Sequence, residues 1–238
     1  MRIEKPQSRC VHTSRRHFLL LSLASTLYAK EALAGDHGKA GAVHNQVIAG
    51  SVVVNGLKMK SGDSLNDAEI NLQTTKSSAI IAMGSNVFLV SPESDINFEL
   101  DGDKRFTGLK LGLGAVHSVF TPKAGKRVVK TPHATIGIRG TGHYAEVQPD
   151  HNRTYSCCCY GAIEIENNAS GTREAQQTSY HEARIITAAG GIEAAPYDVP
   201  LNHYDDSLVH LEKLAGREPH WTLPNGELIF FNPNPLPK

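Results

Sequence analysis

Cysteine is scarce in this chain, and its spacing does not suit a disulfide framework. Four cysteines occur in 238 residues: Cys10 lies near the N-terminus, and the other three are the consecutive residues Cys157, Cys158 and Cys159. Disulfide scaffolds need cysteine pairs at separated positions. The sequence therefore excludes a disulfide-stapled fold. It leaves core packing, metal binding and thiol redox chemistry as explanations of the three adjacent cysteines.

An excess of charge of one sign is also missing. The chain has 24 basic and 24 acidic residues, and from Gly35 onward 18 are basic and 22 acidic, with no basic stripe. A mildly acidic chain of this kind is a poor ligand for nucleic acid, so no nucleic-acid partner is expected. Beyond the N-terminal region no apolar run is long enough to span a bilayer, so no transmembrane helix is expected in the mature chain.

Familiar catalytic motifs are absent as well. The chain has no G-x-S-x-G, no phosphate loop and no paired C-x-x-C, and His181-Glu182 is not followed by a second histidine at zinc-hydrolase spacing. The acidic residues Asp205, Asp206 and Glu212 are expected on a solvated helix face or at a helix cap. We therefore predict that the protein is not an enzyme.

The first 34 residues contain the parts of an export signal. Arg15 and Arg16 form a twin-arginine pattern, an apolar run follows over 18–29, and Ala32 and Ala34 supply an A-x-A cleavage site. The run of about 12 residues is too short to cross a bilayer as a helix. The sequence predicts a signal peptide over 1–34 and export to the periplasm by the twin-arginine route. That route generally carries proteins folded in the reducing cytoplasm, where thiols meet metals before oxidants.

Short alternating strands dominate the pattern from residue 43 to 165. Runs of 4–7 β-prone residues are separated by turn residues every 8–12 positions, and helical periodicity is missing. Asn55-Gly56 predicts a tight hairpin, and 106–112 and 115–120 are expected as two successive strands. The expected fold is mainly β, as a sandwich, a roll or a short β-solenoid-like domain, with one C-terminal helix.

A longer hairpin is expected over residues 131–165. Two alternating runs flank a turn at 148–153, and the second run carries the three cysteines. In an extended strand Cys157 and Cys159 point to one face and Cys158 to the other.

The order of these motifs resembles the FecR domain, the extracytoplasmic domain of the iron-dicitrate regulator family. The likeness covers about 48–165, and the FecR-like β domain is placed at 43–166. The motif residues are Thr131, Pro132, Gly137, Arg139, Gly140, Thr141 and Gly161. The resemblance implies a mainly β, non-catalytic module for periplasmic sensing or relay.

The chain departs from the well-studied FecR regulators in two respects. Those proteins carry a cytoplasmic anti-sigma segment and a membrane helix before the domain, whereas this chain has an export signal. The cysteine run is also no part of the general family pattern. The resemblance thus implies a stand-alone exported version that acts as a binding, scaffold or sensory module, with an envelope protein or polymer as partner.

A C-terminal extension is expected over 167–238. It should contain a loop or hairpin tip at 167–177, a strand at 180–187 and a helix at about 203–215. Asn202 or Asp205 can cap the helix, and Gly216 can end it. The tail, with Trp221, Phe230 and Phe231, is expected to lie extended against the domain.

The cysteine cluster is the candidate site. Soft thiolates suit Zn(II), Cu(I) or an iron centre, but two cysteines need at least a third ligand. The first candidate is His181, expected on a strand beside the cysteine strand; His143 and His151, in the same hairpin, come second. Metal binding by Cys157, Cys159 and His181 is the second functional hypothesis, after the binding module. Thiol redox chemistry is the third.

Overall fold

The computed structural model describes residues 45–122, 125, 127–196 and 200–218. These residues all fall within one compact unit. The expected signal peptide over 1–34 and the aromatic residues of the tail lie outside the described residues. No helix of the described part is long and apolar enough to cross a membrane.

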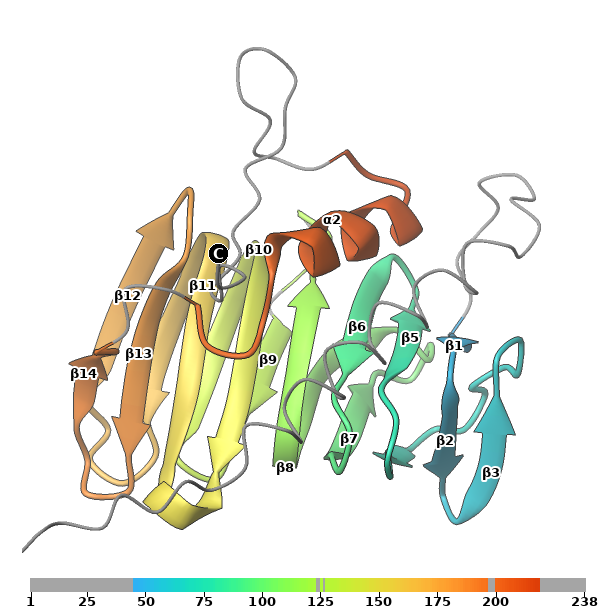
Figure 1. The fold of residues 1–238 in the computed structure, drawn as a ribbon, viewed down its shortest axis with the longest axis horizontal. Coiled ribbons are helices and arrows are strands. Elements are labelled where there is room, and N and C mark those ends of the chain that lie inside the picture. Colours follow the sequence, from blue (N-terminus) through green and yellow to red (C-terminus); the bar gives the residue numbers. More distant parts are fainter. Residues whose placement is uncertain (1–44, 123–124, 126, 197–199, 219–238) are drawn as a thin grey trace, which may run out of the picture. The chain divides into compact units, whose positions relative to one another are not determined.

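Fourteen strands and one α-helix make up the described part of the chain (Figure 1). The strands are β1 (Gln46–Ala49), β2 (Ser51–Val54), β3 (Leu57–Lys60), β4 (Ile70–Gln73), β5 (Ala79–Met83), β6 (Asn86–Val90), β7 (Asp95–Leu100), β8 (Phe106–Val119), β9 (Arg127–Lys130), β10 (Ala134–Gln148), β11 (Arg153–Asn167), β12 (Arg173–Thr178), β13 (Glu182–Thr187) and β14 (Ile192–Ala194). The helix is α2 (Asp205–Leu214), and one turn of 3-10 helix, Pro149–His151, joins β10 to β11. The prediction of a mainly β fold with one C-terminal helix is confirmed.

Three long strands change partners along their length, which divides the sheet into two layers. The first part of β8 pairs with β7 and β9, and its last part with β6 and β10. The first part of β11 pairs with β13 and its last part with β12. Glycines at positive φ lie at these changeover points: Gly114 in β8, Gly140 in β10 and Gly161 in β11. Positive φ costs glycine little, so the strands can bend there.

The layer that carries Cys157 and Cys159 is named the site layer. It consists of β1, β5, β6, β13 and β14 with the adjoining parts of β8, β10 and β11. Its inner face packs on the other layer, as the ring centroids of Phe88 in β6 and Phe98 in β7 are 5.2 Å apart. Its outer face is covered by α2, which contacts β6 and β8.

Several strand predictions are confirmed, one is wrong and one holds with different bounds. Asn55 and Gly56 have positive φ and close the hairpin of β2 and β3, and β10 and β11 form the long hairpin. Residues 106–119 are one strand instead of two, because Gly114 bends β8 without ending it. The loop or hairpin tip expected at 167–177 is a hairpin, but its turn is limited to 168–172, because 173–178 form β12, which pairs with β11.

The helix lies inside its predicted range, but its start differs from the prediction. Tyr204 is the N-cap and makes no side-chain cap hydrogen bond. The Asn202 amide instead donates to Glu146, and the Asp205 carboxylate bonds to Tyr180 and His181. Tertiary contacts have therefore replaced local capping. Gly216 follows the helix with φ +70°, as expected for a helix stop.

Two of the three acidic residues expected on a solvated face are buried. Asp206 is exposed, but Asp205 and Glu212 are 1% and 0% exposed. Glu212 accepts hydrogen bonds from the Tyr160 hydroxyl and from Arg217 Nε, the latter at 2.6 Å. These donors offset the cost of burying a carboxylate. Glu212 thereby fastens α2 to β11.

A substitution at Gly114 tests the bend in β8. A Cβ there would lie 2.2 Å from Ser94 Oγ, and φ is +80°. We expect Gly114→Ala to lower the free energy of unfolding by about 3 kcal/mol, from left-handed strain and overpacking together. Gly62→Ala is the matched control, because φ is +91° but no atom lies within 4 Å of the added Cβ. Equal losses in urea unfolding of the two variants would contradict the packing argument.

Candidate metal centre

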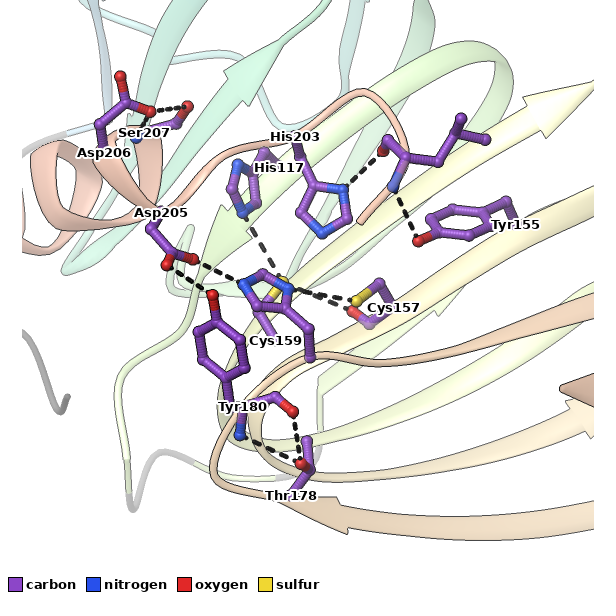
Figure 2. A network of polar contacts seen from close by, with 12 residues as sticks. His117, Tyr155, Cys157, Cys159, Thr178, Tyr180, His203, Asp205, Asp206 and Ser207 are labelled. Atoms are coloured by element: carbon purple, nitrogen blue, oxygen red, sulfur yellow. Dashed lines mark hydrogen bonds and ion pairs between the residues drawn. The ribbon is translucent and has the colours of Figure 1, made fainter. Parts of the chain in front are cut away.

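The cysteines lie on a β-bulge in β11. Tyr160 pairs with Gly142 and Cys158 with the next residue, His143, so Cys159 is an extra residue without an opposite partner. Cys158 belongs to the core between the layers. Cys157 and Cys159 face the outer side of the site layer, where the histidines lie (Figure 2). The predicted alternation of the three side chains is thus confirmed.

A row of side chains crosses the outer face at the level of Cys157. The register places Ala183 of β13, Cys157 of β11, Tyr144 of β10 and His117 of β8 opposite one another in turn. Side chains directly opposite in antiparallel strands share a face and contact each other. The sheet therefore forms the surface on which the other side chains of the site pack next to Cys157.

His181 lies immediately before β13 and is held at both its backbone and its ring. Its N–H donates to the Cys159 carbonyl at 2.9 Å. In the ring, Nδ1 is 3.5 Å from Cys157 Sγ, and Nε2 is 2.7 Å from Asp205 Oδ1. Tyr180 donates to the other oxygen of Asp205 at 2.9 Å. A carboxylate that fixes the far nitrogen of a histidine is typical of metal-binding histidines.

His203 is the fourth member of the site, and the sequence interpretation missed it. It lies in the segment before α2, where Nδ1 donates to the Leu201 carbonyl at 2.7 Å. Its ring stacks on Tyr144, with centroids 4.3 Å apart and planes at 9°. Nε2 is buried without a hydrogen-bond partner in the described part of the chain. A single histidine outside any motif carries no local signal; only its position in space identifies it.

The ligand atoms of Cys157, Cys159, His181 and His203 all lie within 4.8 Å of one another. Bond lengths of about 2.3 Å for Zn–S and 2.0–2.1 Å for Zn–N put sulfur and nitrogen about 3.5 Å apart in a tetrahedral site. The distance between Cys157 Sγ and His181 Nδ1 is 3.5 Å. Two sulfurs and two nitrogens in this arrangement are the donor set of a tetrahedral zinc-type centre.

Without an ion, electrostatics in the cluster favour a thiolate at Cys157 and a protonated imidazole at His181. Burial alone would raise the pKa of Cys157, but a hydrogen bond with Cys159 and the nearby His203 and His181 lower it well below its usual value. Burial and the neighbouring Cys157 raise the pKa of Cys159. Burial alone would lower the pKa of His181, yet the hydrogen bonds to Asp205 and Cys157 raise it to about 9.

The second-choice ligands of the sequence interpretation do not join the cluster. His143 lies one residue out of phase with Tyr144, and its Nε2 hydrogen-bonds to Ser156 at 3.0 Å. His151 is exposed in the turn between β10 and β11. His143 faces away from the cluster because adjacent residues of a strand face opposite sides of the sheet.

Except for Gly161, two residues after Cys159, the residues that carry the FecR resemblance lie away from the four ligands in the chain. Thr131 and Pro132 precede β10, whereas Gly137, Arg139, Gly140 and Thr141 lie within it, and Gly161 lies at the bend of β11. Their placement fits a role in shaping the long hairpin.

Comparison with known proteins gives no family assignment. No family model and no curated protein match the chain, so the FecR assignment stays a prediction. Two solved structures of putative anti-sigma factors from Parabacteroides distasonis ATCC 8503 match with a TM-score of 0.44 each. One is 12% identical over 53% of this chain and 58% of its own; the other is 13% identical over 68% and 82%. At this TM-score the likeness carries no weight for function or partners.

Asp205→Asn tests the buried contact between His181 and Asp205 in metal-free protein. The folded pKa of His181 lies above its usual 6.5, so the stabilisation is fully present below pH 6.5 and is lost as pH rises through about 9. We expect the variant to lose about 3 kcal/mol at pH 6.5 and clearly less at pH 10, in urea unfolding with chelator present. Asp206→Asn, at the exposed neighbour, should lose almost nothing. A pH-independent deficit for Asp205→Asn would contradict the assignment.

Proposed function

We propose that this chain is an exported, non-catalytic β-domain protein that binds one transition-metal ion. Cys157, Cys159, His181 and His203 are the ligands, and Zn(II) is the ion that suits two thiolates and two imidazoles in a tetrahedral arrangement. The observation that carries the proposal is the convergence of one ligand atom from each of these four residues, all within 4.8 Å of one another, with His203 Nε2 buried and without a geometric hydrogen-bond partner in the described residues. A buried lone pair without a donor is costly, and a metal ion removes that cost.

The proposed centre suits a structural or sensory role better than catalysis. Four protein ligands complete a tetrahedral ion, whereas catalytic zinc keeps one position for water or substrate. Cys157 and Cys159 are 1% and 0% exposed. A centre of this kind couples metal binding to the folding of the segments that supply its ligands.

Metal binding takes precedence over the other two hypotheses for specific reasons. A thiol redox protein needs a solvent-accessible thiolate, and both sulfurs of the cluster are buried. The FecR-like binding module remains compatible with a metal ion, since the ion would hold a domain that engages an envelope partner. The support for a bound ion is the close approach of the four ligand atoms, which lie within 4.8 Å of one another.

Elemental analysis of the protein purified from the periplasmic fraction tests the metal. We expect one zinc ion per chain in the natural protein and almost none in the double variant Cys157→Ser with Cys159→Ser, because serine replaces both thiolate ligands. Cys158→Ser is the matched control: this neighbour belongs to the core and should leave the metal content unchanged.

Cobalt loading supplies a second measurement of the same site. A tetrahedral Co(II) site with thiolate ligands should show thiolate-to-cobalt charge-transfer bands, which the double variant should lose. The proposed function would be overturned if the natural protein is purified without metal and also fails to bind added Zn(II) and Co(II).

Export is tested separately at the twin-arginine pair. Arg15→Lys with Arg16→Lys keeps the positive charge but removes the pattern, so we expect the chain to remain in the cytoplasm with its N-terminal segment uncleaved. Cell fractionation and the mass of the purified chain measure this. Normal periplasmic recovery of the variant would contradict the twin-arginine route.

A further inference from the structure

One buried histidine beside the proposed centre is not among its four ligands. His117 lies on β8, opposite Tyr144, and is 2% exposed. Its Nε2 is 3.8 Å from Cys159 Sγ, and Figure 2 shows the ring directed at that sulfur. Its ring centroid lies 5.1 Å from that of His203 in an edge-on arrangement.

The surroundings of His117 decide which ring nitrogen carries the proton. A neutral imidazole has one N–H and one lone pair. Nδ1 is buried with no hydrogen-bond partner in the described part of the chain, whereas Nε2 faces the sulfur. A buried N–H without an acceptor is costly. The proton therefore belongs on Nε2, and this N–H donates a hydrogen bond to Cys159 Sγ.

We propose that His117 is a positioning residue of the metal centre, whose Nε2–H donates to Cys159 Sγ and holds that sulfur in place for the ion. This inference rests on the proposed function. Cys159 needs such support more than Cys157 does. It is the extra residue of the bulge and has no opposite residue in β10 to pack against, whereas Cys157 lies between Tyr144 and Ala183. A donor aimed at a metal-bound thiolate also stabilises the charge that the sulfur keeps.

Two substitutions separate the hydrogen bond from the packing of the ring. His117→Phe keeps a ring beside His203 and Tyr144 but removes the N–H. His117→Gln gives up the ring and keeps an N–H donor at similar reach. We expect the Phe variant to bind Zn(II) about 10–100-fold more weakly in chelator competition, and the Gln variant to recover most of that loss.

His133→Leu is the control for a buried histidine with a purely structural role. His133 is also buried in this domain, and its ring bonds to Thr154 and Asn152 instead of the cluster. This variant should lower the urea midpoint of the metal-free protein without changing zinc affinity. In the Co(II) form, the charge-transfer band should shift for His117→Phe and stay in place for His133→Leu.

The outcomes distinguish this inference from the proposed function. Wild-type protein that binds no metal overturns both. Wild-type protein that binds one ion, with unchanged affinity and spectrum in His117→Phe, overturns only the role of His117. Two ions in the wild type and one in His117→Phe would also overturn it, because His117 would then be a ligand. If His117→Phe does not fold, His117→Ala takes its place, since it also lacks the N–H: zinc binding about 10–100-fold weaker supports the role, and unchanged affinity with an unshifted band overturns it.

Discussion

The backbone pairing of β10 with β11 is the interaction on which the rest of this structure depends. The two strands run side by side from Ala134 opposite Asn167 to Gln148 opposite Arg153, and the bulge at Cys159 is part of this pairing. Both layers of the sheet share these strands, so the pairing holds the layers together. The bulge also sends Cys159 and Tyr160 toward the segment that carries α2. A change in register by one residue would exchange the inner and outer faces and disperse the site.

The second constraint is the attachment of α2 and the residues before it. Glu212 bonds to Tyr160 and Arg217, and Arg217 Nη1 also donates to the Ser85 carbonyl at 3.0 Å. At the other end of the helix Asp205 bonds to Tyr180 and His181. Buried carboxylates are tolerated because each has its donors, and they orient the helix more narrowly than apolar contacts alone would.

These two constraints prepare the proposed centre in advance of any ion. His203 is held by the Leu201 carbonyl and by the Tyr144 ring, and the Leu201 N–H donates to the Tyr155 hydroxyl at 3.2 Å. His181 is held by Asp205. Ligands whose rotamers are fixed by neighbours lose little entropy when an ion binds, which favours affinity and selects for geometry. The same contacts connect the ion to α2, so a bound ion would stabilise the attachment of that helix to the sheet.

The sequence by itself determined most of the strands, the long hairpin and the faces of the cysteines. Alternation is a property of the extended chain, so Cys157 and Cys159 share a face wherever the strand goes, and His181 followed from a strand expected beside them. Only the tertiary structure brought His203, Asp205 and His117 to the sulfurs. These positions depend on the docking of a segment about 45 residues further along the chain and on the pairing of β8 with β10. Long-range packing is a sum over many contacts that no local pattern encodes, which is why a helix cap was expected where Asp205 holds a histidine.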